Sequence, residues 1–257
     1  MAFLGAAASP SQLLVTTGSF LAWLLVQQSL AGPLLSRVFG QSLWTSRTAE
    51  ERHACGISMT CGCYGVAAVS FGLIGLLYPS PSVEADPIYG YSDFVQFAAA
   101  HGVGFFLWNI LAENSRAWGG WDKFAHHALC IVAHLVSQHP FSPKCLCMLM
   151  LFEFSTPPLC AFNVLRWLGL EDTQAYRNCR VAFAVLFFVF RIAFGIPMTA
   201  AWYADMYTLA ADPLREVHSM AVFNIMLIVP IPFMCLQLWW FRLIARAVLK
   251  KGKKQVK

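Results

Sequence analysis

Seven apolar stretches, each 17 to 29 residues long, follow one another along this chain with polar segments between them. A helix needs about 20 apolar residues to cross the hydrocarbon core of a bilayer, which is about 30 Å thick. The stretches cover residues 11–35, 54–78, 93–112, 124–140, 144–169, 180–204 and 218–246. They predict an all-α membrane protein with about seven transmembrane helices. The fourth stretch has 17 residues, so it also fits a partly inserted helix.

The composition excludes a soluble globular protein. Apolar residues make up 58% of the chain and charged residues 12%, whereas soluble domains carry about 25% charged residues. No segment is polar enough to form a separate soluble domain, so we expect one membrane domain. The first basic residue, Arg37, follows the whole first apolar stretch, and a cleaved signal peptide is therefore not expected.

Basic residues alternate between the two sides of the predicted bundle. Loops that connect spans on one side, together with the C-terminal tail, hold 15 Lys and Arg residues, whereas the opposite loops hold only Lys144 and Arg215. Cytosolic loops carry the excess of basic residues, so we expect a cytosolic C-terminus and a lumenal or extracellular N-terminus. Seven of the basic residues lie in 242–257, a tail typical of a topology anchor or an anionic-lipid contact rather than of nucleic-acid binding.

The nine cysteines do not predict a metal site. Five of them stand singly in or beside apolar stretches, where a cysteine behaves as a small hydrophobic residue. Two pairs have C-x-C spacing, Cys61 with Cys63 and Cys145 with Cys147, but no histidine lies at a zinc-ligand interval from them. We therefore expect neither a bound metal nor a bound cofactor.

Ionisable side chains in a span cost at least about 2.5 kcal/mol and need a partner or a cavity. In the fourth span Asp122 precedes His126 by four residues, so its carboxylate is placed to orient that imidazole. His127 and His134 are seven apart and project from nearly one face. Adjacent histidines supply a general base with a nucleophile or an acid, or they form hydrogen bonds between helices; the sequence leaves both interpretations open.

The fifth span contains a predicted break. Pro157 and Pro158 remove two helical hydrogen bonds near its middle, and Glu153 and Ser155 lie at that point. Non-helical backbone at membrane depth is tolerated where it lines a cavity or is packed by protein, so this is the strongest cavity signal in the chain. Asn163 lies ten residues beyond Glu153, on a different or adjoining edge of the helix.

Two further spans carry isolated polar residues. Arg191 lies near the middle of the sixth span with no acidic residue within four positions, so its partner must come from another helix. Glu153 is the economical partner, either in a structural ion pair or in binding a substrate headgroup. Pro197 is expected to kink the helix beyond it. In the third span, the spacing of His101 and Asn109 favours hydrogen bonding between helices.

These residues resemble the TLC-domain family, which includes ceramide synthases, translocon-associated TRAM proteins and TLC domain-containing lipid-homeostasis proteins. The resemblance covers about residues 45–249, after an N-terminal segment, 1–44, with the first helix and before a basic cytosolic tail, 250–257. It is carried by short motifs in the fourth, fifth and sixth spans: Asp122-Lys123-x-x-His126-His127, Glu153-x-Ser155-x-Pro157, Asn163, Arg166-Trp167 and Arg191.

The resemblance implies a barrel of six helices around a cavity for an acyl chain, with a peripheral first helix. In the ceramide synthases, adjacent histidines that correspond to His126 and His127 transfer an acyl group from acyl-CoA to a sphingoid amine. Those enzymes also carry an aspartate-rich motif in the next helix. This chain instead has Glu153-Phe154-Ser155-Thr156-Pro157 there, which resembles the TLC domain-containing subgroup.

Two functions follow as hypotheses. The first is an acyl-CoA-dependent acyltransferase for a sphingoid or phospholipid, with His126, His127 and Asp122 as catalytic residues. Its substrate-binding residues would be Glu153, Ser155, Asn163, Arg191, His134 and His101. The second is a non-catalytic protein that binds lipid and regulates phospholipid composition, and a trafficking or translocation accessory is a remoter alternative. The resemblance favours the endoplasmic reticulum, then the plasma membrane, as the location; the sequence does not identify an oligomeric state.

Overall fold

The computed structural model describes residues 9–114, 120–139, 141–212, 217 and 219–255, and all regular structure in these ranges is helical. The α-helices are α1 (Pro10–Leu25), α2 (Ala31–Phe39), α3 (Gln41–Thr45), α4 (Ala49–Leu77), α5 (Pro81–Ala85), α6 (Asp93–Asn114), α7 (Trp121–Gln138), α8 (Pro143–Met150), α9 (Thr156–Trp167), α10 (Gln174–Leu186), α11 (Gly195–Ala211), α12 (Met220–Ile228) and α13 (Pro230–Gln255). Short π- or 3₁₀-helical segments join several of them: Val26–Leu30, Leu151–Ser155 and Phe187–Ala193.

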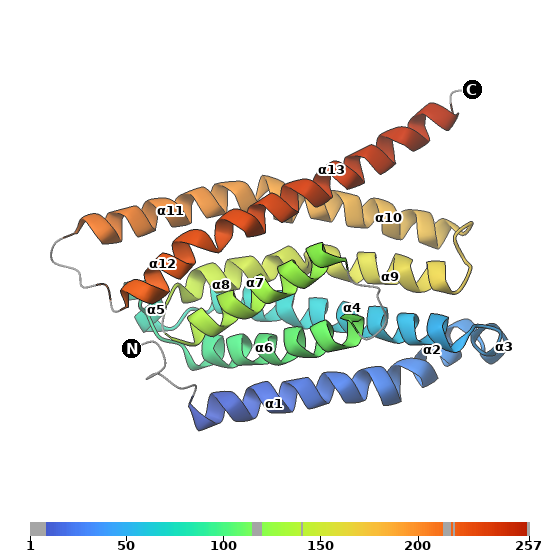
Figure 1. Cartoon of the computed structure of the whole chain (residues 1–257), viewed down its shortest axis with the longest axis horizontal. Coiled ribbons are helices and arrows are strands. Elements are labelled where there is room, and N and C mark those ends of the chain that lie inside the picture. The colour runs from blue at the N-terminus through green and yellow to red at the C-terminus, as the bar shows by residue number, and fades with distance from the viewer. Residues whose placement is uncertain (1–8, 115–119, 140, 213–216, 218, 256–257) are drawn as a thin grey trace.

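The helices form an elongated bundle of roughly parallel and antiparallel passes (Figure 1). Six helical segments in the described residues are long and apolar enough to cross a membrane. They are Pro10–Phe39, Ala49–Leu77, Asp93–Glu113, Pro143–Trp167, Gln174–Ala211 and Met220–Val248. The chain is therefore an integral, multi-pass membrane protein.

The fourth predicted span corresponds to α7, which does not belong to these six. It has 18 residues and lies within three residues of the predicted bounds, but Asp122, Lys123 and three histidines lower its apolar character. Figure 1 nevertheless shows α7 running along the bundle beside the longer passes, with the two chain termini at opposite ends. An odd number of helical passes along the bundle gives that arrangement, so α7 is the seventh pass, and its three histidines are buried.

Local sequence signals set where several helices begin. Ser9 caps α1 and Thr48 caps α4, each in a capping box with the residue three positions later, Gln12 and Glu51. Gly40 adopts φ +91° between α2 and α3, a backbone conformation that favours glycine. These caps satisfy backbone N–H groups that a helix start leaves without partners.

The predicted break in the fifth span is present. Leu151–Ser155 forms a 3₁₀-helical turn between α8 and α9, directly before Pro157 and Pro158. The sixth span is also irregular, because a π-helical segment, Phe187–Ala193, contains Arg191. Pro197 lacks the N–H that would bond to the carbonyl of Ala193, which is the residue where this segment ends. Both irregular segments face each other in the bundle.

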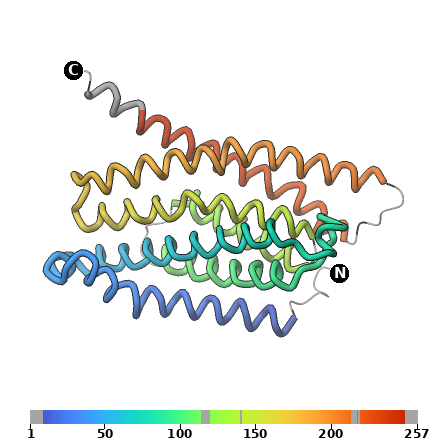
Figure 2. The backbone as a smooth tube through the Cα atoms, turned by 180° about the vertical axis from the view of Figure 1, so that it is seen from behind, coloured from blue at the N-terminus to red at the C-terminus, as the bar shows by residue number. Residues whose placement is uncertain are grey.

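The first pass is peripheral. Figures 1 and 2 show α1 along the outer edge of the bundle, next to α6, and Ser19 is the buried residue of α1. Its hydroxyl donates to the carbonyl oxygen of His101 at 2.8 Å. Gly104 allows this close approach, because a Cβ at that position would lie 2.7 Å from Cβ of Ser19. The predicted peripheral first helix is thus confirmed.

Candidate functional site

A cavity of about 660 Å³ lies inside the bundle, and all six passes other than the first line it. The lining comes from α4, α6, α7, α9 with the preceding 3₁₀ turn, α10 with the π-helical segment, and α13. This arrangement is the six-helix barrel that the sequence resemblance implied. Its volume falls in the range of about 300 to 1,000 Å³ that is typical of small-molecule sites.

The histidine pair lines this cavity. His127 is 9% exposed, its ring packs against that of Phe106 with centroids 5.8 Å apart, and no hydrogen bond to its ring nitrogens is present in the described part of the chain. The ring of His126 is packed more closely. It stacks on Phe233 at 5.4 Å and meets Trp240 edge-on at 5.1 Å, both from α13. The two histidines therefore differ in their packing: rings of α13 cover His126, whereas the ring of His127 packs on α6.

Asp122 is linked to the histidine pair through Trp240. Its Oδ2 accepts a 2.7 Å hydrogen bond from Nε1 of Trp240, the residue whose ring meets His126. The sequence predicted that the carboxylate would orient His126 directly, from the next turn of the same helix. In the described structure Asp122 instead holds the indole across 118 residues of sequence, and the indole packs on the imidazole.

Arg191 and Glu153 form the predicted ion pair, with Nη2 and Oε1 3.5 Å apart. Arg191 is 4% exposed, and its guanidinium also lies over the ring of Phe187. Further hydrogen bonds hold all three of its nitrogens, and the accepting atoms are the carbonyl oxygen of Phe152 (3.1 Å), Oγ of Ser155 (2.9 Å), Oε1 of Gln237 (3.1 Å) and Oγ1 of Thr156 (3.4 Å). Thr156 in turn donates to the second oxygen of Glu153.

The 3₁₀ turn explains this cluster. It places the Phe152 carbonyl and the Ser155 hydroxyl on one side, where Nε of Arg191 reaches both. Ser155 is 1% exposed; its hydroxyl accepts a hydrogen bond from Arg191, and the residue does not line the cavity. Glu153 and Arg191 do line the cavity, but their charges are paired with each other.

One end of the cavity holds two basic residues and is called the basic end, although the acidic Glu113 of α6 also lines the cavity. Lys123 at the start of α7 and Arg166 near the end of α9 both line it and are exposed. Asn163, one turn before Arg166, lines the same wall. Arg116, one of the 15 basic residues expected on the cytosolic side, and Arg215, expected on the opposite side, lie outside the described residues.

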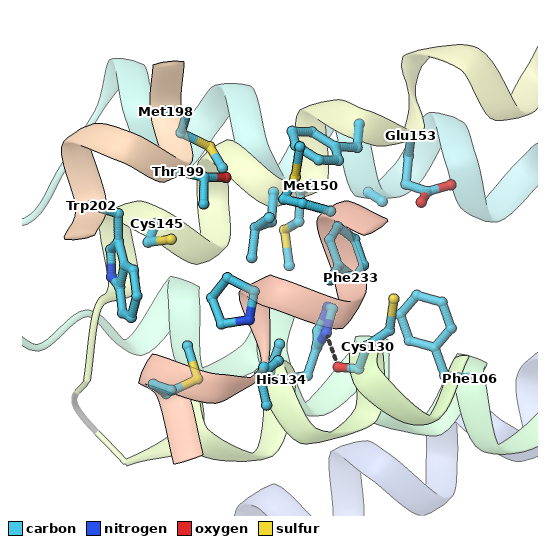
Figure 3. A pocket seen from close by; sticks show the side chains of 18 of the residues that line it. Phe106, Cys130, His134, Cys145, Met150, Glu153, Met198, Thr199, Trp202 and Phe233 are labelled. Carbon is cyan, nitrogen blue, oxygen red and sulfur yellow. Dashed lines mark hydrogen bonds between the residues drawn. The ribbon is translucent and has the colours of Figure 1, made fainter. Parts of the chain in front are cut away.

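A second, smaller pocket of about 60 Å³ adjoins the large cavity, and Phe106 and Glu153 line both. Figure 3 shows this pocket with apolar side chains on most sides, His134 at its edge and Trp202 at the end away from Phe106. Nδ1 of His134 lies 2.8 Å from the carbonyl oxygen of Cys130. Its Nε2 edge faces Gly102 on α6, where an added Cβ would overlap the ring. His134 is therefore a packed residue of the apolar pocket, apart from the histidine pair.

His101 lies away from both pockets. Its ring packs among the aromatic rings of Trp23, Tyr64, Phe71 and Phe97, at centroid distances of 5.4 to 6.2 Å. The structure thus groups His126, His127, Glu153, Asn163 and Arg191 in one cavity and places His134, Ser155, Asp122 and His101 around or outside it. No group of three or more His, Cys, Asp or Glu suited to a metal ion occurs among the described residues.

Sequence reasoning missed three residues of the site. Trp240 lines the cavity and donates a hydrogen bond to Asp122. Gln237, one turn earlier on α13, is fully buried against Arg191. Asn109 was assigned to contacts between helices and also lines the cavity. Gln237 and Trp240 are three residues apart in an apolar span, so their polar groups lie on one face of the helix. This spacing was a signal that both belong to the site.

The comparison with protein families identifies the class of this barrel. The family model described as the TLC domain of TRAM, LAG1 and CLN8 matches residues 22–246. The chain therefore belongs to the TLC-domain family. Curated proteins gave no significant match. Family and architecture together support a multi-pass, membrane lipid-related protein.

Proposed function

We propose that this protein is an acyl-CoA-dependent lipid acyltransferase in which His127 is the general base. The observation that carries the proposal is that His127 lines a cavity of ligand size with ring nitrogens that accept no hydrogen bond in the described residues. Imidazole is well suited to proton transfer near neutral pH.

The reaction balances without a bound cofactor. The hydroxyl or amine of an acceptor lipid, a sphingoid base or a phospholipid, attacks the thioester carbonyl of acyl-CoA. A ring nitrogen of His127 takes the proton of the attacking group, the carbon–sulfur bond breaks, and the proton passes to the thiolate of CoA. His126, held by Phe233 and Trp240, supports the ring of its neighbour.

The ends of the cavity suit the two ends of such a substrate. Lys123 and Arg166 stand at the basic end, where CoA phosphates would bind by charge-assisted hydrogen bonds. The pocket of Figure 3 continues from Phe106 and Glu153 into an apolar space suited to hydrocarbon. With the basic end in the cytosol, acyl-CoA reaches the site from the side where it is made. We place the protein in the endoplasmic reticulum or the plasma membrane.

The test is an activity assay on the wild-type protein in lipid nanodiscs. Radiolabelled palmitoyl-CoA is added with sphinganine or lysophospholipid, and free CoA and the new acyl lipid are both measured. Equal amounts of CoA and acyl lipid, absent without protein, are expected. Hydrolysis without acyl transfer, or no turnover in protein that retains a bound lipid, would overturn the proposal.

A second candidate is a non-catalytic lipid-binding protein that regulates phospholipid composition. It is favoured by the bond between Asp122 and Trp240, because a carboxylate so engaged does not orient a catalytic histidine. Mass spectrometry of copurified lipid tests this candidate. A single lipid class bound stoichiometrically, with no turnover in the assay above, is its expected result. A trafficking or translocation accessory predicts neither result.

A further inference from the structure

Asn109 carries an acceptor atom that the protein leaves unused. Its side chain is 4% exposed, it lines the large cavity, and Nδ2 donates to Sγ of Cys61 on α4 at 3.5 Å. Oδ1 has no hydrogen-bond partner. Among the described residues that line this cavity, Asn109 alone has a buried side-chain nitrogen or oxygen without a partner. Folded proteins retain few such atoms, because each loses its hydration without compensation.

The position of Asn109 places this acceptor close to the histidine pair. Asn109 follows Phe106 by three residues on α6, so the two side chains share a helix face. The Phe106 ring packs on His127, which reaches the cavity from the neighbouring helix α7. Asn109 and His127 therefore border the same part of the cavity. In this orientation of the amide, Nδ2 contacts Cys61 and Oδ1 is left for a ligand.

Other unpartnered atoms do not offer a ligand the same space. Nε2 of His134 faces the backbone of Gly102, so nothing fits between them. Nε2 of Gln237 belongs to a residue with no exposed surface, which binds Arg191 through its oxygen. Asn109 thus combines an unused acceptor with a side chain that lines the large cavity.

We propose that Oδ1 of Asn109 accepts a hydrogen bond from a hydroxyl or amine of the lipid bound in this cavity. Asn109 then selects lipids that carry a polar hydrogen at the end of a hydrocarbon chain over those in which that hydrogen is replaced by a methyl group. The inference rests on the proposed function in one respect: it takes this hydroxyl or amine to be the group that accepts the acyl chain. Binding itself needs no acyl-CoA.

A binding assay without acyl-CoA tests the inference. Purified protein in detergent is titrated with tritiated oleyl alcohol, and unlabelled oleyl alcohol and oleyl methyl ether compete. Wild-type protein is expected to bind the alcohol about tenfold more tightly than the ether, the size expected for one hydrogen bond in a buried site. Asn109→Leu, which has similar volume and no amide, is expected to bind both equally. Its unfolding temperature is expected to equal or exceed that of wild type, because an unpartnered polar atom has been removed.

Matched variants keep the test decisive. Asn224→Leu removes an exposed amide from α12, at a residue that lines neither pocket, and is expected to keep the tenfold preference. Asn109→Ala repeats the test with a smaller side chain if the leucine variant does not fold. Equal affinity of wild type for the two ligands, no saturable binding of the alcohol, or a preference that survives in the folded Asn109 variants would overturn the inference. If the protein prefers the alcohol but transfers no acyl group, the inference about Asn109 is supported. Only the proposed enzyme activity is then contradicted.

Discussion

Two sets of buried polar side chains line the same cavity and differ in how they are satisfied. Arg191 is bound through all of its guanidinium nitrogens, by a carboxylate, a carbonyl, two hydroxyls and an amide. His127 and Asn109 retain ring nitrogens and an amide oxygen without partners in the described residues. Polarity at membrane depth therefore does not by itself mark function. A satisfied cluster stabilises the fold, and an unsatisfied one leaves its atoms for a ligand.

The largest effect on stability is expected at Arg191. Arg191→Met leaves Glu153 as a mostly buried carboxylate without its cation and is expected to lower the free energy of unfolding by about 3 to 5 kcal/mol. Unfolding of the detergent-solubilised protein in denaturant measures this change. Arg177→Met, on the same pass but exposed, is the control and is expected to cost about 1 kcal/mol or less.

The double variant Arg191→Met, Glu153→Gln sharpens this result. It removes both charges, so it is expected to recover part of the stability that the single variant loses. If Arg191→Met unfolds no more easily than Arg177→Met, the hydrogen bonds and ion pair of Arg191 do not stabilise the fold. The distinction between a stabilising Arg191 and a functional His127 would then be wrong.

Gly102→Ala is expected to have the next largest effect, about 1 to 3 kcal/mol of destabilisation. The added methyl group would overlap Cδ2 and Nε2 of His134, which is held on its other side by the Cys130 carbonyl. Gly18→Ala is a matched helix control, because nothing lies within 4 Å of the added Cβ. Thermal unfolding of the two variants, followed by circular dichroism, compares them. Equal unfolding temperatures would show that His134 is not packed against α6.

The smallest effect is expected for Trp240→Phe. The change removes the hydrogen bond to Asp122 and is expected to cost about 1 kcal/mol, since a partly exposed carboxylate regains water. Trp239→Phe, next in sequence and 45% exposed, is the control and should be close to neutral. Denaturant midpoints at pH 7 measure both. An equal loss in the two variants would mean that the bond to Asp122 contributes nothing.

Apolar length and proline chemistry predicted much of this fold. The break before Pro157 and the pairing of Arg191 with Glu153 followed from the cost of a free charge and a missing N–H in a membrane. The passage of α7 was harder to judge, because its three histidines lower its apolar character yet are covered by neighbouring helices. Apolar content alone does not distinguish such a covered helix from a partly inserted one.

The site was less predictable than the fold because its contacts join distant segments. Asp122 and His126 have the spacing of a helical pair, yet the carboxylate bonds to Trp240 on the last pass. His101 and Asn109 share a helix face, but one lies among aromatic rings and the other borders the cavity. Rotation and depth of each helix decide these outcomes, and both are set by packing between passes.

The central claim is that His127 is available for chemistry while its surroundings hold the fold. The most direct test measures acyl transfer from palmitoyl-CoA by wild-type protein and by His127→Gln at equal folded fractions. We predict that the variant loses at least about 100-fold in rate, the scale of general-base catalysis, while its unfolding temperature stays close to that of wild type. Undiminished transfer by folded His127→Gln protein, or its loss only because the variant unfolds, would contradict the account.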